Sequence, residues 1–268
     1  MPISPAPKPS LKDPRLLRRS NPMLKSIVAA VLFSTALPLA AENRQVRGLP
    51  IPGGYDRVTY PEGSYSRWLQ DAPLKATKTI RLYDGRTYSE GSNWYNIAAV
   101  LGLPLLFDRD LEQCADFAMR LWAEYHAATD KLDQLHLYNY DGTKNRLTSD
   151  AKGYRNFLRL AMANSNSYSI KTGARKVAAA DLRAGDMFVQ NENGGIGHVS
   201  VIVDVAKSKE AGRPDLYRVG FSFMPAQEFH IETATDEHGK DGWFTREGFE
   251  KLLSERLGSL GRPVLRRF

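Results

Sequence analysis

The sequence holds a single cysteine, Cys114, among its 268 residues, so no disulfide can form within the chain. Excess charge is also scarce outside the N-terminal segment. The formal net charge is +7, but residues 1–40 carry six Lys or Arg and one Asp, and the remaining chain holds only about +2. This charge is too small to indicate nucleic-acid binding, and no nucleic-acid partner is expected.

The N-terminal segment has the composition of a signal peptide. From Met23, a possible true start, a positive stretch leads into an apolar run from Ile27 to Leu39, followed by small residues at Ala40 and Ala41. No cysteine lies near that site, which excludes a lipid anchor there, and no later apolar run reaches 18 residues. We expect residues 1–41 to be removed and the mature protein to be soluble, exported and periplasmic, without a transmembrane segment.

The remaining residues, 42–268, are expected to form one α+β domain, because one principal helix precedes a run of closely spaced strands. The strands are expected to form an antiparallel sheet. A polar stretch over about 138–174 is interpreted as an insertion containing one helix. The expected helices cover residues 64–74, 110–128 with Asp110 as N-cap, 154–163 and 245–257, and the expected strands cover 79–88 with a turn at 84–85, 97–107, 187–190, 198–205, 216–223 and part of 261–268.

Cys114 lies near the start of the helix predicted over 110–128. Unpaired backbone N–H groups and the helix dipole at that position lower the pKa of a thiol, which is how a nucleophilic cysteine is activated. The alternative is a buried structural cysteine, because Cys114 shares a helical face with Phe117, Leu121 and Trp122.

His198 is the first residue of a predicted strand and follows the glycine-rich stretch 191–197. The glycines remove bulk around the imidazole, which could then act as general base toward a cysteine and as acid toward a leaving group. The alternative is a solvated histidine at a strand end. The glycine-rich stretch is not a phosphate-binding loop, because a strand rather than a helix follows it.

The order of these motifs resembles the bacterial papain-like cell-wall hydrolases of the NlpC and CHAP type. In that pattern a helix opens with Cys, a turn of the form L-x-x-G-D enters a strand, and a later strand begins His-Val. Cys114, the turn from Leu182 through Gly185 to Asp186, and His198 match it in order. The resemblance implies a papain-like fold and a Cys–His nucleophilic mechanism, and the insertion explains why the two residues are 84 positions apart.

A resemblance over nearly the whole mature chain is to the exported bacterial proteins grouped as domain of unknown function 4846, carried by QCADFAMRLWAEY, GHVSVIVDVA and SFMPAQEFHI. Many members of that family are lipoproteins and carry Gln where this chain has Phe221. A polar third residue normally orients a catalytic imidazole. Ser222 and Gln227 are the nearest candidates, and Gln113 could contribute to an oxyanion hole. The alternative is that Ser222 and Gln227 are plain hydrogen-bonding residues and that Gln113 is solvated at the helix start, which is the commoner situation for such a residue.

Other polar and aromatic groups carry weaker signals. His230, Asp236, Glu237 and His238 fit no known ligand spacing and are interpreted as a polar loop, so neither a metal nor a cofactor is expected. Several aromatic residues could line a glycan-binding groove or simply belong to the core and its rim: Tyr55, Tyr60, Tyr65, Trp94 and Tyr95.

The sequence therefore leads to two hypotheses of different classes. The first is a cell-envelope cysteine hydrolase that cleaves an amide bond in peptidoglycan stem peptides or another envelope substrate, with Cys114 as nucleophile and His198 as base. An acyltransferase or a lipid amidase on the same scaffold has the same signature. The second is a non-catalytic envelope binding or scaffold module, which Phe221 favours. The oligomeric state stays open.

Overall fold

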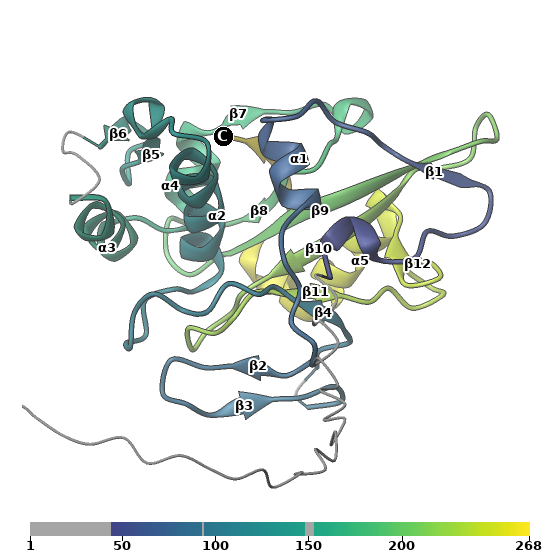
Figure 1. Ribbon diagram of the computed structural model, residues 1–268, viewed down its shortest axis with the longest axis horizontal. Coiled ribbons are helices and arrows are strands. Elements are labelled where there is room, and N and C mark those ends of the chain that lie inside the picture. The colour runs from purple at the N-terminus through teal and green to yellow at the C-terminus, as the bar shows by residue number, and fades with distance from the viewer. Residues whose placement is uncertain (1–43, 93, 148–152) are drawn as a thin grey trace, which may run out of the picture. The chain divides into compact units, whose positions relative to one another are not determined.

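A computed structural model describes residues 44–92, 94–147 and 153–268. The chain divides into two units, Met1–Ala41 and Glu42–Phe268. The predicted signal peptide at 1–41, with the possible start at Met23, lies outside the described residues. The second unit contains all the elements described below (Figure 1).

An antiparallel sheet of ten strands dominates the described part of the chain. Seven strands follow the order β12-β13-β10-β9-β8-β14-β7, β1 pairs with β9, and β11 joins β10 to β4. The long strands β9 and β10 cross the centre of the molecule in Figure 1. The strands are β1 (Tyr55–Arg57), β4 (Ile97–Val100), β7 (Arg175–Lys176), β8 (Met187–Gln190), β9 (His198–Ser208), β10 (Leu216–Phe221), β11 (His230–Glu232), β12 (Gly239–Lys240), β13 (Trp243–Phe244) and β14 (Val264–Arg267).

The antiparallel run of strands predicted over 187–223 is confirmed, and so is the α+β class. The predicted tail strand also forms, and it lies between β8 and β7. The strand predicted over 97–107 is wrong beyond Val100. Gly102 donates its N–H to the carbonyl of Pro73, and Pro104 has no N–H to offer a neighbouring strand.

Five helices flank the sheet in the described part: α1 (Tyr65–Gln70), α2 (Cys114–Ala128), α3 (Tyr154–Asn164), α4 (Ser167–Gly173) and α5 (Arg246–Leu257). Helix α2 packs Phe117 and Leu121 into one core cluster with Val199 and Val201 of β9. Ile202 of the same strand belongs to a second core cluster, which contains residues of α5. Side chains of β9 therefore alternate between two cores. None of the helices within 44–268 that are described is long and apolar enough to cross a membrane.

Helix α2 begins later than predicted. Its N-cap is Gln113 rather than Asp110, so Cys114 is the first helical residue. The cause is tertiary: the buried carboxylate of Glu112 accepts the N–H groups of Leu106 and Phe107 and pairs with Arg120 at 2.7 Å. These bonds hold the main chain before the helix in a non-helical path.

The insertion at about 138–174 contains more structure than predicted. The predicted helix is α3, but the polar segment Ser167–Gly173 forms a second helix, α4, whose N-cap Asn166 accepts the N–H of Tyr168. Two short hairpins complete the fold: β2 (Ile80–Arg81) with β3 (Thr87–Tyr88), and β5 (His136–Tyr138) with β6 (Lys144–Arg146). Short 3₁₀ turns occur at Val46–Gly48, Leu132–Gln134, Ala179–Asp181 and Gly258–Leu260.

Candidate functional site

Cys114 lines a groove of about 500 Å³. The walls of the groove come from the start of α2, the connection between α3 and α4, and the loop before β9. The thiol is at the first position of α2, where backbone N–H groups are not used within the helix. The residue retains 7% of its exposure, and Sγ lies 3.8 Å from the carbonyl oxygen of Gly197. The thiol therefore contacts the main chain at the start of β9.

Burial raises the pKa of the Cys114 thiol to about 12. The backbone N–H of Val199 lowers the pKa and the nearby carboxyl of Asp116 raises it, but both effects are smaller than that of burial. The helix N-terminus does not overcome the loss of solvent. At neutral pH the thiol is protonated and therefore a poor nucleophile.

The imidazole of His198 is almost fully buried, with 1% exposure. Its Nε2 lies 2.9 Å from Ser200 Oγ, and its ring packs edge-on against Phe221 at 5.0 Å between centroids and beside Phe223 at 5.6 Å. Within the described residues Nδ1 has no hydrogen-bond partner. Burial, followed by repulsion from His230, lowers the pKa of His198 to about 3, so the ring is neutral.

The fold brings Cys114 next to the main chain at the start of β9, where His198 lies. The two side chains nevertheless contact different neighbours. The thiol of Cys114 contacts Gly197, and the imidazole of His198 contacts Ser200, two residues further along β9. Across the described part of the chain, no hydrogen bond joins Sγ to the imidazole. The catalytic roles of both residues stay predictions.

The three supporting residues are also engaged elsewhere. Ser222 Oγ bonds to the carbonyl oxygens of Gln227 and Glu112, at 2.7 and 3.0 Å. Gln227 shares hydrogen bonds with the hydroxyl of Tyr95, and Gln113 donates its amide to Asp110. None of these contacts involves the His198 ring, so their orienting and oxyanion roles stay predictions as well.

Asp186, in the L-x-x-G-D turn, has a structural role. Its carboxylate is fully buried, forms an ion pair with Arg267 and accepts the backbone N–H of Arg183 at 2.9 Å. Its main-chain carbonyl accepts the N–H of Ile202 at 2.8 Å. The turn therefore fixes the position of β8 against β9 and β14.

Sequence reasoning missed three features of the groove. Asp116 is 8% exposed, and its Oδ1 has no partner within the described residues. Burial raises the pKa of this carboxyl well above its ordinary value. Ile196 and Met224, exposed at 71% and 38%, also line the groove. Of these three residues only Asp116 could have been recognised from the sequence, because it follows the cysteine by two positions on the predicted helix. Ile196 and Met224 lie in loops, where the sequence gives no regular spacing.

The residues considered as metal ligands do not come together. The interpretation of all four as a polar loop is wrong for His230, which is buried in β11 and pairs with Glu232 at 3.2 Å, because its strand lies within the core. His238 lies between Thr235 and Glu255, and Glu237 pairs with Lys251. Among the residues that the structure describes, no three His, Cys, Asp or Glu side chains form a group that could hold a metal.

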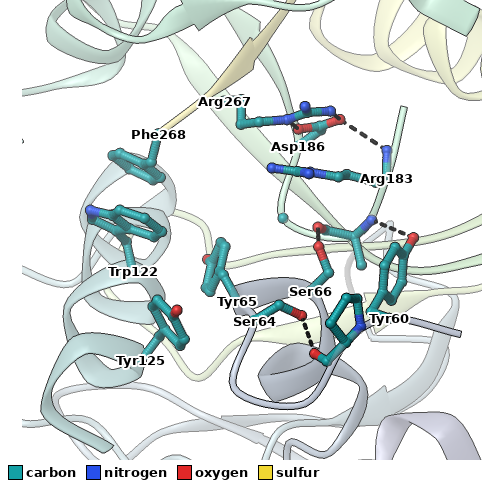
Figure 2. A pocket seen from close by; sticks show the side chains of 13 residues that line it. Tyr60, Ser64, Tyr65, Ser66, Trp122, Tyr125, Arg183, Asp186, Arg267 and Phe268 are labelled. Atoms are coloured by element: carbon teal, nitrogen blue, oxygen red, sulfur yellow. Dashed lines mark hydrogen bonds and ion pairs between the residues drawn. The ribbon is translucent and has the colours of Figure 1, made fainter. Parts of the chain in front are cut away.

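The aromatic residues considered for a glycan groove separate into two sets. Tyr55 and Tyr95 belong to the buried core, and Trp94 packs against Tyr95 at 4.7 Å. Tyr60 and Tyr65 line a second cavity, which is distinct from the Cys114 groove and shares no lining residue with it (Figure 2).

The comparisons with known proteins support the resemblance to the domain of unknown function 4846. The family model described as "Domain of unknown function (4846)" matches residues 46–156 and 142–256, which together cover more than half of the chain. No curated protein and no solved structure matches the chain.

Proposed function

This chain belongs to the domain of unknown function 4846 family, and from that premise we propose that it is a non-catalytic binding protein of the cell envelope. The proposal takes the scaffold to be papain-like, and it is supported by a helix that begins with cysteine and packs on an antiparallel sheet whose strand β9 begins His-Val. The signal-peptide composition of residues 23–41 supports export. The groove at Cys114 holds an amide-containing ligand without cleaving it.

The observation that carries this proposal is the state of the two central side chains. A working Cys–His pair needs a thiolate beside an imidazolium, so the thiol pKa must fall and the imidazole pKa must rise. Here burial has the reverse effect on each group: it raises the pKa of the Cys114 thiol to about 12 and lowers the pKa of the His198 imidazole to about 3. Each side chain also has its own separate contact, to Gly197 and to Ser200.

The groove retains features of a binding surface. Few large apolar side chains are exposed in the described part, and two of them, Ile196 and Met224, flank this groove. Asp116 also lines the groove, and its buried Oδ1 has no hydrogen-bond partner within the described residues. A peptide-like ligand with an amide group and an apolar side chain matches this combination.

Co-sedimentation with purified peptidoglycan sacculi tests the proposal. We expect the wild-type protein to sediment with sacculi and to release no fragments. Ile196→Glu places a charge in the groove and is expected to weaken binding at least ten-fold. Leu160→Glu is the control, because Leu160 is also an exposed apolar residue and lies on α3 outside the groove. A wild-type protein that does not sediment, or an equal loss in both variants, overturns the proposal.

A cysteine hydrolase is the second candidate, favoured by the position of Cys114 at the first residue of α2 and beside a groove. In this reaction Cys114 attacks the amide carbonyl, while His198 takes the thiol proton and returns it to the leaving amine. An acyltransferase or lipid amidase uses the same first step. Sacculus fragments that appear with wild-type protein and are absent with Cys114→Ala, identified by mass, support this candidate against the binding protein.

A further inference from the structure

A second cavity, of about 300 Å³, lies away from the Cys114 groove. Four segments far apart in the sequence form it: the chain from Tyr60 into α1, the C-terminal half of α2, the turn before β8 and the end of β14. Figure 2 shows the rings of Trp122, Tyr125, Tyr65 and Phe268 on one side of the cavity, and the guanidinium groups of Arg183 and Arg267 with the ring of Tyr60 on the other.

The aromatic side is a contiguous set of rings. Trp122 stacks on Phe268 with centroids 5.4 Å apart and an interplanar angle of 7°. Tyr65 meets Trp122 edge-on at 5.0 Å and lies 5.3 Å from Tyr125. Such surfaces bind the flat face of an aromatic ring or the C–H face of a sugar.

The walls are held in place by hydrogen bonds and close packing. The hydroxyl of Tyr60 accepts the N–H of Ala184 at 3.0 Å, and Ser66 donates to the carbonyl of Ala184 at 2.6 Å. Gly185 has a φ of 98°, and a side chain there would collide with the ring of Tyr65. The cavity therefore exists without rearrangement, which lowers the cost of binding.

The charges on the opposite side do not cancel. The Arg267 guanidinium is neutralised by the buried carboxylate of Asp186. The guanidinium of Arg183 has no hydrogen bond or ion pair within the described ranges, although it lies beside Arg267 in Figure 2. Arg183 is an exposed residue. Partial loss of solvent, followed by the charge of Arg267, lowers the pKa of its guanidinium, and a bound carboxylate would offset the repulsion between the two guanidinium groups. Two guanidinium groups, those of Arg183 and Arg267, therefore lie near the single carboxylate of Asp186, which leaves one positive charge in excess on this side of the cavity.

We propose that this cavity binds a small molecule in which a six-membered ring carries a carboxylate. The carboxylate takes two N–H groups of the Arg183 fork, and the ring lies against Trp122 and Tyr65. The volume suits a single ring with its substituent. The inference does not depend on the function of the Cys114 groove, since the two sites have no lining residue in common.

Calorimetric titration of the whole protein with four probes tests this inference: phenylacetate, glucuronate and their neutral counterparts phenylacetamide and glucose. We expect at least one carboxylate to bind, with its neutral counterpart at least ten-fold weaker. Binding of phenylacetate alone assigns an aromatic ring to the ligand, and binding of glucuronate alone assigns a sugar ring. Absence of binding by both carboxylates at millimolar concentration overturns the inference.

Two variants that each remove one positive charge distinguish a direct contact between Arg183 and the carboxylate from a general electrostatic attraction to the protein. Arg183→Gln is expected to weaken carboxylate binding at least ten-fold and to remove the preference over the neutral probe. Arg175→Gln removes the same charge from an exposed residue that lies outside the cavity, and it is expected to change affinity less than two-fold. Unchanged binding in Arg183→Gln, or equal losses in both variants, overturns the inference.

Discussion

Cys114 Sγ lies 3.8 Å from the carbonyl oxygen of Gly197. The next residue after Gly197 is His198, and its imidazole forms a hydrogen bond with Ser200 rather than with the thiol. The thiol and the ring therefore occupy neighbouring positions without forming a pair. Because both are deprived of solvent and neither has an opposite charge nearby, both are most stable in their neutral forms. This relationship is the reason why we propose a binding groove rather than an active site at Cys114 and His198.

Gly197 is required for the contact between β9 and its neighbours. A methyl group at this position would collide with Ser167 Oγ and with the carbonyl oxygen of Gln190 on β8. We predict that Gly197→Ala lowers the free energy of unfolding by about 1–3 kcal/mol, as overpacking commonly does. Gly195→Ala, where a methyl group meets open space, is the control. Equal urea midpoints for the two variants would show that the start of β9 can shift freely.

Glu112 holds the chain ahead of α2 through its buried pair with Arg120, whose side chain is 3% exposed. We predict that Glu112→Gln destabilises the fold by about 3 kcal/mol, because the charge of Arg120 is left buried without its main partner. Glu210→Gln, in an exposed pair with Arg213, should leave the urea midpoint unchanged. Chemical denaturation of both variants measures the difference, and a wild-type midpoint for Glu112→Gln would contradict the importance of this pair.

The neutral state of His198 makes stability depend on pH. The folded-state pKa is about 3, below the ordinary value of 6.5, so the unfolded chain binds a proton over this range and the folded chain does not. Stability is retained above pH 6.5 and is lost as the pH falls toward 3, by up to about 1.4 kcal/mol per pH unit.

The variant His198→Gln keeps a polar group near Ser200 but does not titrate. We predict that the stability advantage of wild type over this variant shrinks as the pH is lowered from 6.5 to 4.5. Urea denaturation at several pH values measures it, and the comparison cancels the contributions of the other titrating groups. Parallel curves for the two proteins would mean that His198 is protonated as easily in the folded chain as in the unfolded one.

Much of the framework could be predicted from local pattern. Strand β8 has its predicted bounds, and α5 begins after Thr245, whose hydroxyl accepts the N–H of Gly248 as an N-cap does. The start of α2 could not be predicted, because it depends on tertiary bonds of Glu112. Helix α4 was missed because its sequence is polar and short.

The arrangement of the candidate site was harder to predict for a different reason. Periodicity places Cys114 at a helix start and His198 at a strand start, but it does not say which neighbours each side chain contacts. That choice depends on how β9 divides its side chains between two cores, and on Phe221 and Phe223 packing around the imidazole. The cavity of Figure 2 joins four distant segments and has no local sequence signal.

The rate of alkylation of Cys114 by iodoacetamide as a function of pH tests the central claim most directly. With a thiol pKa of about 12, we predict labelling at pH 8 about a thousand-fold slower than for the same residue in urea-unfolded protein. We also predict an unchanged pH profile in His198→Gln. Rapid labelling near pH 6 that is lost in His198→Gln would show a thiolate activated by the imidazole, and it would contradict the account of a non-catalytic groove.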